Sequence, residues 1–107
     1  MLERHKIPTL KPEELARIRT MNLHRSSERA SMQRYSIDEL KQTRDRIGVR
    51  VQRAETAYRI VKNNIAIPKD LRDQAELIYF KAQISLEECE REIKEQEQRS
   101  HLGDVVL

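Results

Sequence analysis

The sequence has few of the residues on which several protein classes depend. Its 107 residues include one cysteine, two glycines, three prolines, three tyrosines, one phenylalanine and no tryptophan. A single cysteine excludes an internal disulfide framework. Two glycines are too few for the turns of a many-stranded sandwich or barrel. These shortages favour a helical protein of a reducing compartment.

Long apolar runs are also missing. No stretch approaches the roughly 18 apolar residues that a membrane-spanning helix needs. Residues 1–5 lack the apolar core and the cleavage site of a secretory signal. We therefore expect an intracellular protein of the cytoplasm or nucleus that contacts no membrane, and a component of a virus or phage stays open as an alternative.

Charge is abundant and unevenly distributed. The chain has 21 Lys and Arg against 18 Asp and Glu, a formal net charge of +3. Residues 1–35 carry eight basic and four acidic side chains, residues 36–64 seven and four, and residues 65–107 six and ten. The sequence is thus basic at first and acidic afterwards. Such a division is typical of a nucleic-acid-binding face or of two segments that pack together.

Residues 37–64 predict a long helix. Ser36 and Glu39 have the spacing of a capping box, in which each side chain bonds the backbone amide of the other residue. Steps of three and four then define one stripe, in which Arg44 is the only charged residue. Gly48 either leaves room for a helix contact or for the Arg44 side chain, or is simply tolerated. The apolar members of the stripe are Ile37, Leu40, Ile47, Val51, Ala54, Tyr58, Val61 and Ile65.

A second long helix is predicted from Pro68 to about Arg99, ahead of Gly103. Its inner stripe drifts away from a strict heptad because two consecutive steps are of four residues. A connection of about four residues favours antiparallel neighbours. We therefore expect an antiparallel, coiled-coil-like helical hairpin over residues 36–100 and a tail over residues 101–107. The second stripe comprises Leu71, Ala75, Ile78, Ala82, Leu86, Cys89 and Ile93.

Residues 1–35 predict a basic N-terminal arm with a short helix over about residues 12–23. Pro12 with the following two glutamates is typical of a helix start. Residues 24–31 have almost nothing to bury, so a frayed helix, a linker and an arm that orders on a partner are all compatible with them. The predicted fold is all-α: a helical hairpin with an additional N-terminal helix.

Five apolar residues flank the two predicted stripes. A hairpin packed along one stripe covers them only in part, and burying a large aliphatic side chain is worth about 1.5–3 kcal/mol. The N-terminal helix can cover some of them, but a second copy or another helical protein is the more natural cover, so we expect a helical bundle completed in that way. The predicted interface residues are Val49, Ile60, Leu77, Phe80 and Ile84.

Arg46, Arg50 and Arg53 share one face of the first long helix, with no acidic residue three or four positions away. One interpretation is a solvated face partly paired with glutamates across the hairpin. The alternative is contact with the phosphate backbone of duplex RNA or DNA. Aromatic residues suited to stacking on single strands do not lie between these arginines.

The sequence offers no constellation typical of catalysis or metal binding. His5, His24 and His101 are far apart, and Cys89 on the inner stripe is typical of a small buried hydrophobe. The glutamates of residues 87–97 are expected to pair along their own helix, as Glu87–Arg91, Glu90–Lys94 and Glu95–Arg99. We expect no catalytic residue, metal, cofactor or small-molecule substrate.

Together these features predict a non-enzymatic helical interaction protein: an adaptor, scaffold or structural subunit acting through helix packing with itself or with another helical protein. The alternative is a dimeric module that binds a duplex nucleic-acid backbone through its arginine face. The sequence alone does not decide between them.

Overall fold

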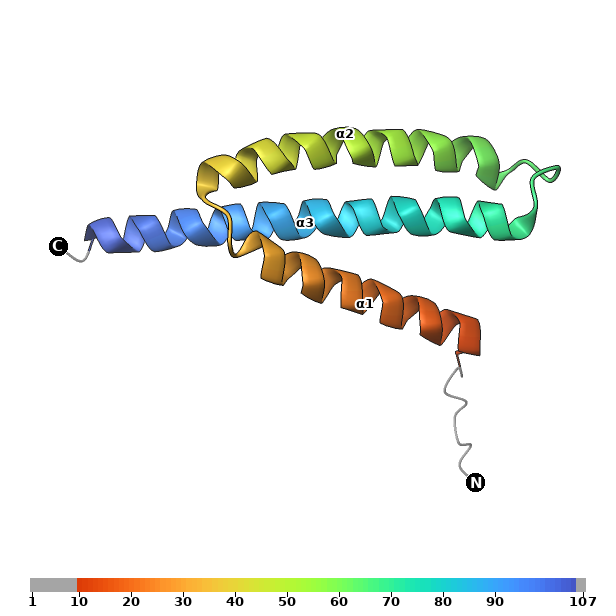
Figure 1. Cartoon of the computed structure of the whole chain (residues 1–107), viewed down its shortest axis with the longest axis horizontal. Helices are drawn as coiled ribbons and strands as arrows, with labels where there is room; N and C mark the ends of the chain where they lie inside the picture. Colours follow the sequence, from red (N-terminus) through yellow and green to blue (C-terminus); the bar gives the residue numbers. More distant parts are fainter. Residues whose placement is uncertain (1–9, 106–107) are drawn as a thin grey trace, which may run out of the picture.

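The computed structural model describes residues 10–105, with side chains described as far as residue 100. It contains three helices, α1 (Pro12–Met32), α2 (Ile37–Lys62) and α3 (Lys69–Val105), and no strand within those residues. Helices α2 and α3 lie side by side with opposite chain directions, and α1 lies on the other side of α3 (Figure 1). The predicted all-α class is confirmed.

The limits of α2 follow from local sequence. The Ser36 side chain accepts a hydrogen bond from the Glu39 amide at 3.2 Å, and the Glu39 carboxylate accepts one from the Ser36 amide at 2.9 Å. This reciprocal pair satisfies two amides that a helix start leaves without partners. The helix ends at Lys62, two residues before the predicted end, and α3 begins directly after Pro68, one residue from the predicted start.

Two helices are longer than predicted. Helix α1 continues to Met32 instead of ending near residue 23, because the polar residues that follow find partners on α3. Helix α3 passes through Gly103 to Val105, since one glycine weakens a helix by about 1 kcal/mol without ending it. Most of the predicted tail is therefore helical, and residues 106–107 lie outside the described residues.

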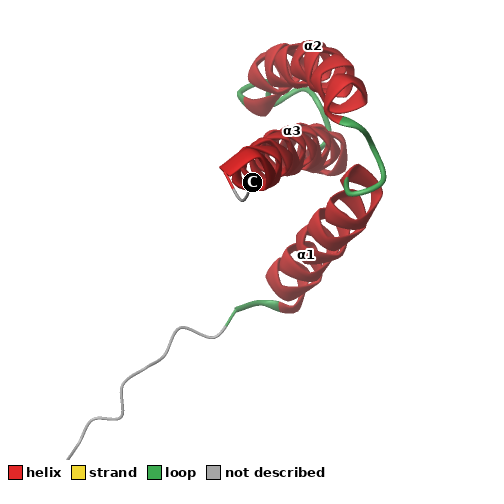
Figure 2. Ribbon diagram, turned by 90° about the vertical axis from the view of Figure 1, so that its left-hand side faces the viewer, coloured by secondary structure: helices red, strands yellow, loops and turns green. Residues whose placement is uncertain are grey.

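The three helices form one layer. The molecule measures 60 × 47 × 17 Å, and its radius of gyration is 18.9 Å, compared with about 13 Å for a compact chain of roughly 100 residues. Viewed from the end of the layer, α2, α3 and α1 follow one another in a shallow curve (Figure 2). Helix α3 is therefore central, and both faces of the layer are open.

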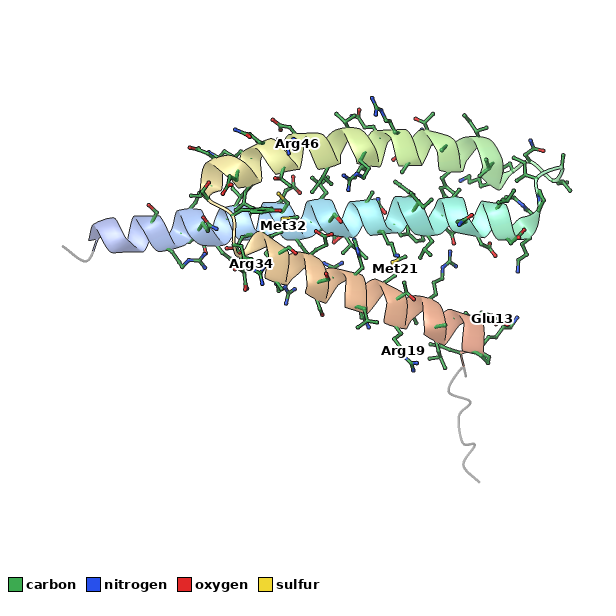
Figure 3. All side chains as sticks on the ribbon, in the orientation of Figure 1. Glu13, Arg19, Met21, Met32, Arg34 and Arg46 are labelled. Carbon is green, nitrogen blue, oxygen red and sulfur yellow. The ribbon has the colours of Figure 1, made fainter. Side chains whose placement is uncertain are left out.

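The apolar core lies where all three helices meet. Met32, at the end of α1, lies near the crossing of α1 and α3 (Figure 3). Leu40 and Cys89 are fully buried, and the Cys89 thiol donates a hydrogen bond to the Leu40 carbonyl at 3.2 Å. The core is short, because it occupies one end of the layer only. It comprises Met32, Leu40, Ile47, Cys89 and Ile93, with Val51 and Leu86 packed against them.

The predicted stripes of α2 and α3 agree with burial near this core and fail at the far end. Leu71 and Ile78 are both exposed, and Ile65 lies beyond the end of α2 with its side chain in solvent. Tyr79 takes the inner position instead and stacks on Tyr58, with ring centroids 5.7 Å apart. Successive four-residue steps rotate a stripe around its helix, which explains the difference.

Candidate interaction surfaces

The contact between α1 and α3 centres on a buried carboxylate. Glu88 of α3 is only 2% exposed. Arg25 donates to it at 2.6 Å and Arg29 donates to its other oxygen at 3.0 Å. Burial acts to raise the pKa of Glu88, but the hydrogen bonds from both arginines outweigh it and hold that pKa below its usual value. Two guanidinium groups on one carboxylate thus fix α1 against α3.

His24 adds a second polar contact to the same interface. Its Nε2 atom lies 2.9 Å from the Ser85 hydroxyl and 3.2 Å from the Lys81 carbonyl. Residues 24–31 have one apolar side chain, that of Ala30, so apolar periodicity gives no indication of this contact. The sequence signal that could have indicated this contact is charge. Residues 1–35 are basic, so they complement the acidic residues 65–107 as α2 does.

A polar and aromatic network links the far ends of the helices. The Tyr58 hydroxyl donates to Glu76 at 2.8 Å, and the Tyr79 hydroxyl donates to Glu55 at 2.9 Å. Arg17 of α1 forms an ion pair with the same Glu76. The bond to Glu55, together with burial, raises the pKa of Tyr79. Side chains from all three helices meet in this network.

Apart from Met32 in the core, helix α1 docks mainly through polar side chains and leaves several apolar residues outside. Leu15, Ile18 and Leu23 are all exposed. Leu15 and Ile18 line a shallow depression of about 340 Å³ together with Arg19, which points away from α3 (Figure 3). An amphipathic helix normally buries its apolar side, so this arrangement leaves α1 with a surface suited to another helix.

A wedge-shaped cleft separates the first turns of α1 from those of α3. It encloses about 860 Å³, and its lining is mostly charged, with Leu77 as its largest apolar member. The remaining lining residues are Lys11, Glu13, Glu14, Ala16, Arg17, Thr20, Lys69, Asp70, Asp73 and Gln74. The cleft is lined by both acidic and basic side chains, so its charge favours neither an anionic nor a cationic ligand.

The five predicted interface residues do not form one surface. Val49 and Ile60 lie on α2, 48% and 66% exposed, in a depression of about 500 Å³. Leu77 lines the cleft just described, and Phe80 packs against the Tyr58 and Tyr79 rings.

Ile84 is the one of these five residues that the chain itself buries. It is 8% exposed, and so it is already buried within the chain. Leu77, Ile84 and Glu88 share one side of α3 by their spacing. That side faces α1, whose unpredicted length covers the middle of α3.

Arg46, Arg50 and Arg53 are all exposed, and among residues 10–100 none forms an ion pair. Figure 3 places Arg46 on α2. Of the glutamates of residues 87–97, Glu87 and Glu88 pair with arginines of α1, and Glu97 approaches Lys41 of α2 rather than these arginines. The arginine face therefore has no internal counterion in the described part of the chain.

The cysteine and histidines, the residue types that most often act in catalysis or metal binding, form no such site in the described residues. Burial raises the pKa of the free Cys89 thiol, and Arg44 offsets this only in part. No group of three or more metal-ligating side chains occurs among the described residues. His5 and His101 lie outside the described side chains.

The glutamate-rich part of α3 is less solvated than expected. Glu88 and Glu92 are both buried. Arg91 approaches Glu88 and Glu95, and Arg99 bonds Glu92 at 3.0 Å in place of the expected partner Glu95. Much of this helix face is therefore structural rather than available for a cation.

Gly48 and Arg44 do not act together. A Cβ atom built on Gly48 meets no neighbouring atom within 4 Å. The Arg44 guanidinium lies 3.6 Å from Asp45 rather than over the glycine. Neither a close helix contact nor the arginine uses the space, which favours simple tolerance of the glycine.

Comparison with known proteins adds no assignment to this geometry. No protein-family model, curated protein or solved structure matches the chain. None of the described helices combines the length and apolar character needed to cross a membrane.

Proposed function

We propose that the chain is a non-enzymatic helical interaction protein, an adaptor or structural subunit that works by helix packing with itself or with another helical protein. We place it in a reducing intracellular compartment, in keeping with its single free cysteine. No cofactor or small-molecule substrate enters this proposal.

The observation that supports it is the single-layer architecture. A layer 17 Å thick leaves the outer sides of α1 and α2 without a neighbour in the chain. Those sides carry exposed Leu15, Ile18 and Leu23 on α1 and exposed Val49 and Ile60 on α2. In stable helical domains, such apolar sides are normally buried against further helices. A coiled-coil-like bundle between chains supplies that cover.

Sedimentation of the full chain over a range of concentrations tests the proposal. We expect reversible self-association, weakened at least tenfold in L15S/I18S, because each exposed aliphatic side chain gains on the order of 1 kcal/mol from burial. R19Q, a variant of an exposed neighbour in the same depression, serves as the control. If the double variant and the wild type self-associated with equal affinity, the apolar side of α1 would not be the contact between chains.

The arginine face supports a second candidate function, binding to a duplex nucleic-acid backbone. Three exposed arginines without ion pairs in the described residues are suited to phosphates. Three phosphate contacts predict an affinity that falls with salt at a logarithmic slope of about −2.7 on DNA, with little sequence preference.

A mobility-shift titration on duplex RNA and DNA at two salt concentrations tests this candidate. R46Q/R50Q/R53Q should abolish most of the binding, whereas R19Q/R34Q/K94Q, which removes the same charge elsewhere, should not. Absence of wild-type binding near physiological salt would exclude the candidate.

A further inference from the structure

The outer side of α2 combines an apolar strip with a row of cations. Val49 and Ile60 are eleven residues apart, three helical turns or about 16 Å along the axis. They mark the two ends of a depression of about 500 Å³ whose other lining residues are Gln52, Arg53, Thr56 and Ala57. Both end residues are exposed, and Ile60 is exposed to 66%.

The cations run along one edge of this strip. With 3.6 residues per turn, Arg46, Arg50 and Arg53 follow the same stripe beside Val49 and Ile60. Arg53 itself lines the depression. None of the three arginines has an ion pair within residues 10–100. The strip thus pairs apolar anchor points with positive charge that nothing described in the chain neutralises.

From this geometry we infer that the outer side of α2 binds an acidic amphipathic helix of another protein. The inference rests on the proposed function and specifies the partner. Two apolar side chains about eleven residues apart on the bound helix cover Val49 and Ile60. Glutamates or aspartates along one edge of that helix pair with Arg46, Arg50 and Arg53.

The apolar strip favours a helix over a phosphate backbone. A phosphate backbone satisfies the arginines but leaves Val49 and Ile60 in water. A protein helix can pair with the arginines and also cover Val49 and Ile60, since an amphipathic helix carries an apolar stripe beside a charged one.

The glutamate-rich residues 87–97 of this chain do not offer a matching strip. Their glutamates either are buried, as Glu88 and Glu92 are, or lie on helix positions without exposed large apolar neighbours. Charge complementarity therefore selects an acidic amphipathic helix of a different chain over this glutamate-rich segment of a second copy.

A designed peptide tests the inference with the full-length protein. The probe is a labelled helix of about 20 residues with two leucines eleven positions apart and glutamates along one flank. A length above about 15 residues favours helix formation in water, where shorter isolated helices are only marginally stable. A control peptide keeps the leucines and replaces the glutamates by lysines. Fluorescence anisotropy at low and physiological salt gives the affinities.

We expect the acidic peptide to bind at least tenfold more tightly than the lysine peptide, with affinity that falls as salt rises. I60S should weaken binding about tenfold or more. L23S, which removes a leucine of equal exposure (66%) from α1, should leave binding within about twofold. R46Q/R50Q/R53Q should weaken binding and flatten its salt dependence, whereas R19Q/R34Q/K94Q should not. Circular dichroism confirms that each variant keeps its helix content.

Several results would overturn the inference. Equal binding of the two peptides, or binding unaffected by I60S, would show that the strip is not the site. Dissociation of the chain's own oligomer by I60S would assign the strip to a second copy. If duplex RNA displaced the acidic peptide, and I60S bound the RNA as tightly as the wild type, the arginines would instead be a phosphate-binding site. Self-association with no peptide binding would reject this inference and leave the proposed function intact.

Discussion

Glu88 shows how a single residue positions a helix. It is nearly inaccessible to water and is held by arginines from two consecutive turns of α1. A buried carboxylate is stable only when its charge is paired and hydrogen-bonded. Burial of the Glu88 charge therefore costs little free energy while α1 is docked, and it becomes unfavourable if either arginine is lost. Glu88 thus selects the observed position of α1.

The E88Q substitution should lower the free energy of unfolding by about 1–3 kcal/mol at pH 7, because it removes charge-assisted hydrogen bonds at a buried site. Urea denaturation followed by circular dichroism measures this. E90Q on the exposed side of α3 should change stability by less than about 0.5 kcal/mol. An equal effect of the two substitutions would contradict the role of Glu88.

The same variant gives a pH test. The folded-state pKa of Glu88 lies below its unfolded value of about 4.3. Its contribution to stability is therefore complete above that unfolded value and is lost as pH falls through the folded pKa. Wild type and E88Q should differ at pH 7 and converge at strongly acidic pH. A difference that persists unchanged in acid would show that charge is not its cause.

Cys89 provides a probe of the small core. Its thiol is fully buried, and burial raises its pKa, so both access and thiolate fraction are low. Reaction with a thiol reagent should be at least about 100-fold slower in buffer than in denaturant, since it requires opening of the α2–α3 contact. Comparable rates in the two conditions would contradict a packed core around Cys89.

At the scale of the helix, sequence was a good guide where the determinants are local. The Ser36–Glu39 capping box and Pro68 set limits of α2 and α3 within one residue of those observed. The second half of α1 was missed, since its stability comes from contacts of His24, Arg25 and Arg29 with a helix about 60 residues away. Hydrophobic periodicity contains no information on such polar docking.

Gly48 gives a prediction for α2 itself. The space around it is open, so G48A should raise the free energy of unfolding by about 0.5–1 kcal/mol through helix propensity. This corresponds to roughly 2–8 °C in the melting temperature of a domain of this size. Differential scanning calorimetry of the dilute chain measures it, with Q52A on the same helix as a control for surface changes. A lower melting temperature would show that another chain packs on Gly48.

At the scale of the whole molecule, the layer determines which residues are available. Sequence spacing identified Val49 and Ile60 as lacking cover, and both are exposed. Spacing also grouped Ile84 with them, but Ile84 is buried within the chain, because polar contacts that spacing does not indicate hold α1 beside α3. Spacing also predicts the arginine face, and its three arginines have no ion pair in the described residues, whereas Glu87 and Glu88 of α3 pair with arginines of α1.

The most direct test of the account is the mass of the full chain in solution. A single layer with uncovered apolar sides on α1 and α2 should not persist alone, because its exposed aliphatic side chains gain stability when they are covered. Sedimentation equilibrium at about 10 μM, a concentration at which contacts worth roughly 7 kcal/mol are half-formed, should give a mass at least twice the 12.7 kDa of one chain. A folded, helical species that stays at 12.7 kDa at this concentration and at tenfold higher concentration would contradict it.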